Sequence, residues 1–167
     1  MDNLQLSQGG CLALASGALA NGTAAGTIKT TVVIPYLVDG VFKSKAITDN
    51  IAVAVALPAT YGVAMNGSFT GGANGSVRLY GIFLDDAGAV TYTPGPVCDV
   101  AALAAGSAAL QFPAPRKGRT CIGVMRVQVN SGVTFIPGTN ALSGTAANTG
   151  LVSYVNLGTI PGEPLRA

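Results

Sequence analysis

The chain has 167 residues and a formal net charge of +2, and 10% of its residues are charged, against about 25% in an average soluble domain. The length suits one domain with its own core, the balanced charge argues against nucleic-acid binding, and no stretch reaches the roughly 18 apolar residues of a membrane span. A surface so poor in charge favours a subunit that is covered by other chains, because charge keeps monomers soluble and apart; the alternative is a small Ala/Gly-rich β domain.

The first 27 residues predict a flexible N-terminal arm. Residues 16–26 are small and uncharged, and their apolar side chains follow no period. The apolar run 11–20 is interrupted by Gly17 and has no basic residue before it, which argues against a secretory signal. We expect the arm to add a strand to a sheet edge of a neighbouring chain. Its candidate partner-binding side chains are Leu12, Leu14 and Leu19.

Residues 28–57 begin a β domain. Residues 30–38 (TTVVIPYLV) and 41–47 (VFKSKAI) are rich in β-branched and aromatic side chains. The Asp39-Gly40 pair between them predicts a hairpin, because a two-residue turn of this kind needs positive φ at both positions. Pro35 indicates an edge strand or a bulge. Residues 51–57 alternate large and small apolar side chains, which suits a strand with protein on both sides.

The central part of the chain predicts a loop, two strands and a short helix. Residues 67–76 (GSFTGGANGS) are rich in turn formers and predict a mobile or partner-facing loop. Strands are expected at 77–84 and from Ala89 onward, joined by a turn at Asp85-Asp86. An aspartate there is explained by bonding to its local backbone, with a weak Ca²⁺ site as the alternative. Asp99 is the expected N-cap of the helix.

The last third predicts strands at 120–129, 132–136 and 151–158. In the first of these, Arg126 shares a face with Val124 and Gln128, so it is expected to point to the polar side. About eight short strands with turn residues between them predict an all-β fold, an antiparallel sandwich, jelly roll or small barrel with at most one short helix. The expected organisation is the arm over 1–27 and one β domain over 28–167, with an extended C-terminal tail from about 159 to 167.

The residue types for catalysis are scarce. The chain has no histidine, which removes the commonest general base and the usual partner of a nucleophilic Ser or Cys. Cys11, Cys98 and Cys121 are widely spaced, which indicates reduced thiols in a protein folded in a cytoplasm. Flanking arginines could lower the pKa of Cys121, but no His or resolving Cys lies nearby in sequence. We therefore expect no enzyme activity, no cofactor and no metal site.

A basic cluster lies at residues 116–119. Arg116, Lys117 and Arg119 surround Gly118, directly after a proline-rich stretch. Aromatic residues are not interleaved with the basic ones, so the stacking platform of a single-strand nucleic-acid binder is missing. Nucleic acid is therefore the weakest interpretation, and two are favoured over it: a solvated loop that leads into the next strand, or a contact to acidic groups on a partner protein.

Residues 110–143 combine a proline-rich lead-in, the basic Lys117-Gly118 turn, the Ile122-Gly123 strand and the element FIPGT at 135–139, which is followed by Leu142. These motifs, together with residues 38–46 (VDGVFKSKA), resemble those of small structural proteins of tailed bacteriophages. The resemblance covers about half of the chain, and its motifs are structural. It implies a virion protein, among which we favour a capsid decoration (cement) protein.

The resemblance implies a β-rich protein that binds the major capsid protein on the outside of the virion. A homotrimer is favoured and a dimer is the other expected state, after folding in the host cytoplasm. The expected contacts are the arm, the basic loop, and the FIPGT loop with Phe135 and Pro137. The alternative is a tail or fibre component, including a receptor- or glycan-binding domain. The absence of Trp counts against a sugar platform.

Overall fold

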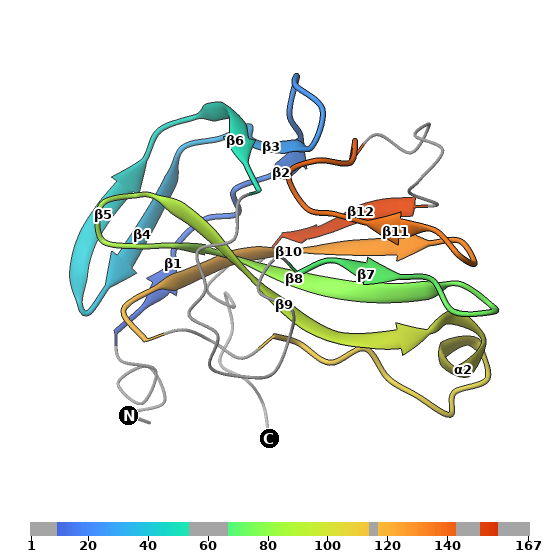
Figure 1. Cartoon of the computed structure of the whole chain (residues 1–167). Coiled ribbons are helices and arrows are strands. Elements are labelled where there is room, and N and C mark those ends of the chain that lie inside the picture. The colour runs from blue at the N-terminus through green and yellow to red at the C-terminus, as the bar shows by residue number, and fades with distance from the viewer. Residues whose placement is uncertain (1–9, 54–66, 114–116, 143–150, 157–167) are drawn as a thin grey trace.

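The described strands pair antiparallel throughout, and the fold is an all-β sandwich, as the sequence predicts (Figure 1). The structure is a computed structural model that describes residues 10–53, 67–113, 117–142 and 151–156. The helix within these ranges is α2 (Val100–Ala104), which has five residues.

The longest strands form one four-stranded sheet with the order β12-β10-β8-β9. Its β10 strand pairs with β8 on one side and β12 on the other, so that Met125 lies opposite both Tyr80 and Tyr154. Met125 and Val127 are buried, whereas Arg126 is half-buried and bonds to a neighbouring side chain on its own strand. The predicted alternation of β10 is therefore confirmed from Met125 to Val129, whereas Val124, on the same side as Arg126, is buried. The strands are β8 (Ser76–Leu84), β9 (Val90–Asp99), β10 (Thr120–Val129) and β12 (Leu151–Asn156).

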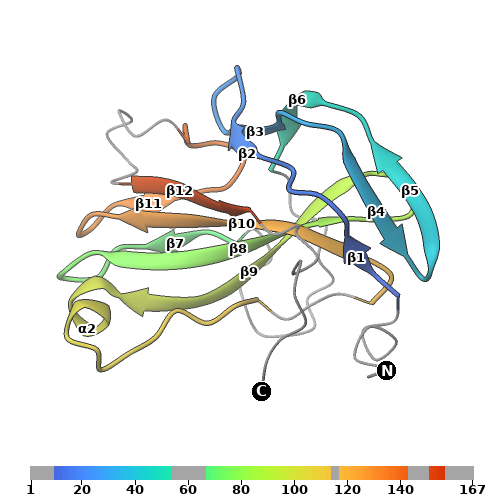
Figure 2. The same ribbon diagram turned by 180° about the vertical axis from the view of Figure 1, so that it is seen from behind.

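Two three-stranded sheets and one two-stranded sheet complete the described fold. The small sheets have the orders β1-β4-β5 and β2-β3-β6, and β7 pairs with β11. Opposite views show β1 and β4 crossing one end of the long sheet, where both strands contact β10 (Figures 1 and 2). The strands are β1 (Leu12–Ala13), β2 (Leu19–Asn21), β3 (Thr27–Thr30), β4 (Ile34–Val38), β5 (Val41–Lys45), β6 (Thr48–Ala52), β7 (Phe69–Thr70) and β11 (Thr134–Phe135).

The core lies between these sheets and is centred on aromatic rings. The Tyr80 ring packs edge-on against Tyr92 and Phe135, with centroids 5.6 and 6.0 Å away. Phe135 in turn packs against Phe69 at 6.0 Å. One cluster of buried residues includes members from all four sheets, for example Ile34 from the β1-β4-β5 sheet. The sheets are thus joined by a common hydrophobic core.

Local turn chemistry follows the sequence closely. Asp39 and Gly40 both have positive φ, 50° and 80°, between the paired residues Val38 and Val41, so the predicted hairpin turn is confirmed. The Asp85 carboxylate accepts hydrogen bonds from the backbone N–H groups of Ala87 and Ala89, at 3.0 and 2.8 Å. These bonds support the backbone interpretation of this aspartate.

The predicted helix also begins where expected. The Asp99 side chain accepts hydrogen bonds from the N–H groups of Ala101 and Ala102, at 2.8 and 3.0 Å. It therefore satisfies two donors that the first turn of a helix leaves without an internal partner. The helix ends before Gly106, whose φ of 69° is easily adopted by glycine.

The prediction of a flexible arm over 1–27 is wrong for residues 10–27. Leu12 and Ala13 pair with β4, and Leu19–Asn21 pairs with β3. Ala13 and Leu19 are buried in the core, at 5% exposure each, so this stretch is part of the domain. A strand of two or three residues is too short to show a period, which is why the sequence did not reveal it. Residues 1–9 and the expected tail at 159–167 lie outside the described residues.

Several further boundaries differ from the prediction, for example β11, which spans Thr134–Phe135 where a strand over 132–136 is expected. Residues 67–76 contain β7, and Phe69 is 7% exposed, so the interpretation as a mobile or partner-facing loop is wrong for this side chain. The expected strand 30–38 is two strands, since β3 ends at Thr30 and β4 begins at Ile34. The expected strand 51–57 is described only as far as Val53, and β6 ends at Ala52.

Candidate docking surface

One face of the β1-β4-β5 sheet points away from the core and is apolar. Ala13 and Tyr36 pair across two strands and are buried, so their side chains form the inner face. Side chains alternate along a strand, and the next row of partners therefore lies on the opposite side. That row joins Leu12 of β1, Leu37 of β4 and Phe42 of β5.

A second row extends the same face. The N–H of Leu14 donates to the Pro35 carbonyl at 2.9 Å, and Pro35 pairs with Ser44 of β5. Phe42 is 62% exposed, while the leucines and Pro35 are half-buried. We call this surface the outer face. It consists of Leu12, Leu14, Pro35, Leu37, Phe42 and Ser44.

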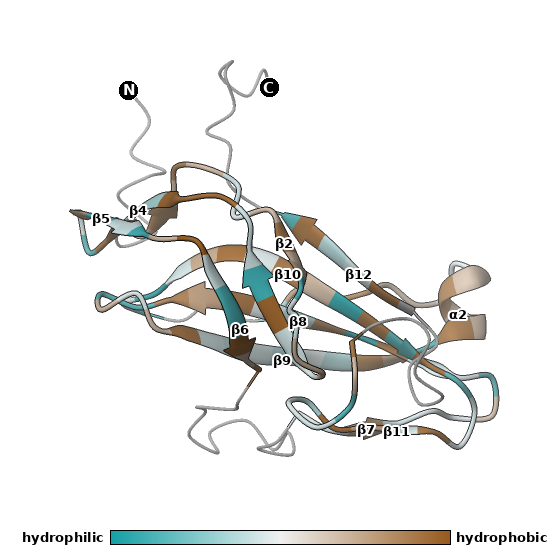
Figure 3. Cartoon of the chain, turned by 90° about the horizontal axis from the view of Figure 1, so that it is seen from above, coloured by the Kyte–Doolittle hydropathy of each residue, from teal (hydrophilic) through white to brown (hydrophobic). Residues whose placement is uncertain are grey.

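Further exposed apolar side chains lie on or beside this sheet, although Val41 pairs with buried Val38 and so belongs to its inner side. Val33, just before β4, is 52% exposed, and Val41 at the start of β5 is 55% exposed. Ile47, which follows β5, is 60% exposed. Coloured by hydropathy, β4 carries hydrophobic brown segments and β5 carries both colours (Figure 3). Exposed apolar residues are normal when scattered, but grouped on one sheet they indicate an interaction surface.

The lysines of β5 point the other way. Lys43 pairs with Tyr36 and Lys45 with Ile34, so both lysines extend along the inner face and are half-buried. A Cβ added at Gly88 would lie 3.7 Å from Lys45 Cδ, which places the lysine stem over the turn at residues 85–88. Among the described strands, β5 pairs only with β4. Inward-pointing charges on such an edge strand disfavour the addition of another strand.

The described part of the basic loop, residues 117–119, lies at the tip of the same hairpin. The N–H of Gly40 donates to the Gly10 carbonyl at 3.1 Å. A Cβ added at Gly118 would lie 3.7 Å from Asp39 Oδ2, which places the loop beside the β4–β5 turn. Lys117 is exposed. Arg119 is half-buried, and its guanidinium donates to the Thr91 hydroxyl on β9.

The structure thus brings Leu12, Leu14 and Lys117 to one end of the molecule. Arg116, the remaining member of the basic cluster, lies outside the described residues. The hydrogen bond of Arg119 to its own domain supports a structural role for that side chain. Lys117 retains both interpretations that the sequence left open.

The other expected contact residues are buried within the domain. Leu19 is 5% exposed, and its N–H donates to the Asn156 side chain at 2.7 Å. Phe135 is fully buried among the core aromatics, and Pro137 is also buried. The expectation that these three side chains contact a partner is therefore wrong. Each of the three is apolar and lies near glycines in the sequence. Because apolar residues near turns occur both in cores and on interaction surfaces, the sequence alone did not show that these positions are buried.

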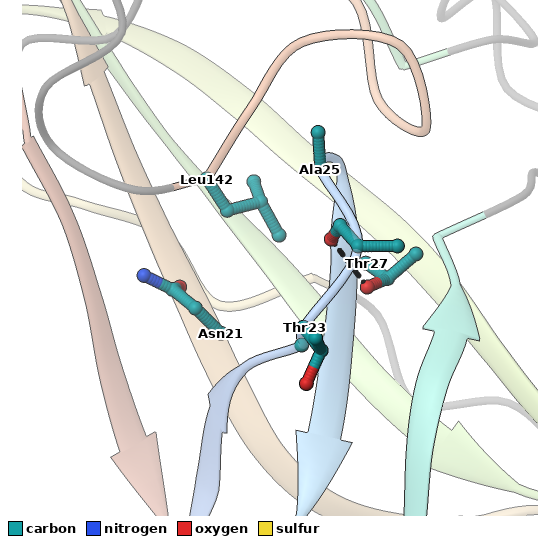
Figure 4. A pocket seen from close by; sticks show the side chains of 7 residues that line it. Asn21, Thr23, Ala25, Thr27 and Leu142 are labelled. Atoms are coloured by element: carbon teal, nitrogen blue, oxygen red, sulfur yellow. Dashed lines mark hydrogen bonds between the residues drawn. The ribbon is translucent and has the colours of Figure 1, made fainter.

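The FIPGT loop instead packs on the hairpin between β2 and β3. Gly26 and Gly138 both have positive φ, and a Cβ added at Gly26 would lie 3.0 Å from the Gly138 carbonyl oxygen. A pocket of about 190 Å³ lies beside this hairpin (Figure 4). Its lining residues are Asn21, Gly22, Thr23, Ala24, Ala25, Thr27 and Leu142.

The polar groups around this pocket bond to one another. Thr27 Oγ1 donates to the Ala24 carbonyl at 2.6 Å (Figure 4). The Asp49 carboxylate accepts from the Thr23 hydroxyl and N–H at 2.5 and 3.0 Å, and these bonds lower the pKa of Asp49. The Asn50 side chain accepts from the Ala24 N–H at 2.7 Å. This network holds the hairpin against β6 and gives the pocket a structural explanation.

A buried arginine is a structural residue outside the outer face that the sequence analysis missed. Arg78 is 3% exposed, and its guanidinium donates to the carbonyls of Gly95 at 2.6 Å, Gly67 at 3.0 Å and Ser68 at 3.3 Å. The guanidinium carbon also lies 5.7 Å from the Tyr80 ring centroid. The signal was present in the sequence, because Arg78 is in phase with Tyr80 and Ile82 on the core face of β8. Arg78 connects β9 and the segment that precedes β7.

The described thiols and acidic groups are not arranged as a reactive or metal-binding site. Burial raises the pKa of Cys121 to about 11, so the thiol remains protonated near neutral pH. No disulfide joins the three cysteines. In the described ranges, no group of three or more His, Cys, Asp or Glu side chains is placed to hold a metal ion. No helix in those ranges is long and apolar enough to cross a membrane.

Comparison with known proteins adds no relative. No family model, no curated protein and no solved structure matches this chain.

Proposed function

We propose that this protein is a structural virion protein of a tailed phage, which binds the outer capsid surface as an oligomer and stabilises the shell. The observation that carries the proposal is the outer face, where five of six side chains are apolar and Phe42 is 62% exposed. The segment 38–46, which resembles phage structural proteins, includes Phe42 and the whole of β5. The resemblance and the exposed surface therefore coincide in one hairpin.

The mechanism is mass action. A protein that binds the assembled shell but not its dissociated subunits stabilises the shell by RT ln(1 + [L]/Kd), which is about 2.7 kcal/mol per site when the free protein is at 100 times Kd. An oligomer that engages several sites at once has a much higher avidity than one subunit. Modest contacts on each subunit are then sufficient.

The test uses empty shells of the major capsid protein encoded in the same genome, assembled without this protein. The purified full-length chain is expected to co-sediment with these shells and to raise their disruption temperature. Bovine serum albumin at the same concentration is the control for non-specific trapping. If the chain stays in the supernatant over a range of concentrations and leaves the disruption temperature unchanged, the proposed function is wrong.

A further inference from the structure

We propose that the outer face packs flat on an uncharged apolar patch of the shell, and that neither strand addition nor the basic loop provides the main contact. This inference rests on the proposed function and specifies its contact surface. Three observations carry it: the chemistry of the outer face, the protection of the β5 edge, and the size of the face.

The chemistry of the outer face defines its partner. None of its six residues is charged, and Ser44 is the only polar one among them. The lysines of β5 lie on the inner face, away from this surface. A charged partner group that docked here would lose its hydration without gaining an opposite charge, which is unfavourable. The complementary surface is therefore apolar and uncharged.

The lysines of β5 argue against the other mode of β recognition, strand addition, at this edge of the sheet. Strand addition needs the free N–H and C=O groups of an edge strand, with side chains that tolerate a new neighbour. A strand added to β5 would bring its own inward side chains against Lys43 and Lys45. It would have to bury these charges or meet them with carboxylates. Packing on the face makes no such demand.

The size of the face argues against a second copy as its sole occupant. With strands about 4.8 Å apart and a rise of about 3.4 Å per residue, three strands of five residues would project roughly 240 Å², an upper bound here because β1 has two residues. Even if this area is doubled to allow for the uneven surface of the side chains, it is below the roughly 800 Å² that each partner buries in a stable complex. One face alone is too small for a lasting dimer. Several faces of one oligomer on a repeating shell would bind through avidity.

The decisive experiment compares two phenylalanines. Phe42 of the outer face is 62% exposed, and Phe112, outside this face, is 47% exposed. The F42S and F112S variants lose the same chemical group from exposed positions. We expect F42S to bind the shells at least tenfold more weakly, with an unchanged melting temperature, and F112S to bind as the wild type does. Equal shell affinities of F42S and wild type would overturn the inference while leaving the proposed function standing.

Salt and light scattering test the two competing contacts. An apolar contact is not screened, so wild-type affinity is expected to change less than about threefold between 0.05 and 0.5 M NaCl. The Lys117→Ala variant is expected to bind as the wild type does. A steep loss of affinity with salt, together with weak binding by Lys117→Ala, would assign the contact to the basic loop. If F42S lowers the mass of the free protein in light scattering, the face contacts a second copy and the inference is wrong.

Discussion

Replacing Arg78 with Met is expected to lower the free energy of unfolding by about 3 kcal/mol. Met retains most of the apolar stem, so the change mainly removes the guanidinium and its three carbonyl partners. Hydrogen bonds from a charged donor contribute about 1.5–3 kcal/mol each, and contact with the aromatic faces of Phe69 and Tyr80 adds about 1 kcal/mol. Removing a desolvated charge returns several kcal/mol, which offsets about half of this loss.

The carbonyl groups that lose Arg78 determine the smallest loss of unfolding free energy that Arg78→Met can cause. The Gly67 carbonyl keeps a partner in the variant, because the Tyr80 hydroxyl also donates to it, at 2.5 Å. The Gly95 carbonyl loses its bond to Arg78, and a buried acceptor without a partner costs about 1–3 kcal/mol. Arg78→Lys keeps the charge but not the fork of donors. The free energy of unfolding of this variant is expected to lie between those of Arg78→Met and the wild type.

The assay is equilibrium unfolding in urea, supported by thermal melts. In a chain of this size, about 3 kcal/mol corresponds to a fall of about 6–12 °C in melting temperature. The matched control is Arg126→Met, because Arg126 is half-buried and its bond in the described structure is to Gln128 on the same strand. This control is expected to stay within about 0.5 kcal/mol of the wild type. If Arg78→Met also changed stability by less than about 1 kcal/mol, the structural role assigned to Arg78 would be refuted.

Three other predictions concern packing, the β5 edge and pH. Gly71→Ala is expected to lower the free energy of unfolding in urea by several kcal/mol, because its Cβ would overlap a backbone carbonyl just after β10. The control is Gly72→Ala, whose Cβ makes only ordinary van der Waals contacts. Equal stabilities of the two variants would refute the close approach at Gly71. The double variant Lys43→Val/Lys45→Val is expected to have a higher mass in light scattering than the wild type, because it lacks the charges that protect the β5 edge from pairing. An unchanged mass would show that these lysines do not protect β5. The folded state holds the Cys121 proton up to a pKa of about 11, against an ordinary value of 9.0, so stability falls as pH rises between these values, by up to about 1.4 kcal/mol per pH unit from this group. In urea unfolding, Cys121→Ala should show a shallower loss of stability between pH 9 and 11, and an equal slope would contradict the assigned shift.

Sequence reasoning succeeded where the physical signal was local. The Asp39-Gly40 turn needs positive φ at adjacent positions, and Asp99 needs only the next three residues to act as an N-cap. The alternation from Met125 to Val129 in β10 is also visible within a few residues. Such features follow from short-range sterics and hydrogen bonding, and the rest of the fold does not change them.

The candidate surface depended on contacts that are distant in sequence. The sequence predicts Leu12 and Leu14 as contact residues. It does not predict Leu37, because Leu37 joins them only through the pairing of β1 with β4. The same pairing explains why residues 10–27 were misjudged as an arm. A two-residue strand is stable only because its partner strand and the core already exist. No local pattern records that dependence.

The distribution of charge explains how a whole sheet face can remain uncharged. Several of the few charged groups in the chain serve its own backbone: Arg78 binds buried carbonyls, and Asp85 and Asp99 accept from turn and helix N–H groups. Asp49 similarly fixes the β2–β3 hairpin. Charges used in this way are held at turns or within the core, and they are not available to separate the outer face from an apolar partner. A low charge content and an apolar outer face are therefore two consequences of the same choice of residues. The charges of Lys43 and Lys45 disfavour strand addition at the adjacent β5 edge.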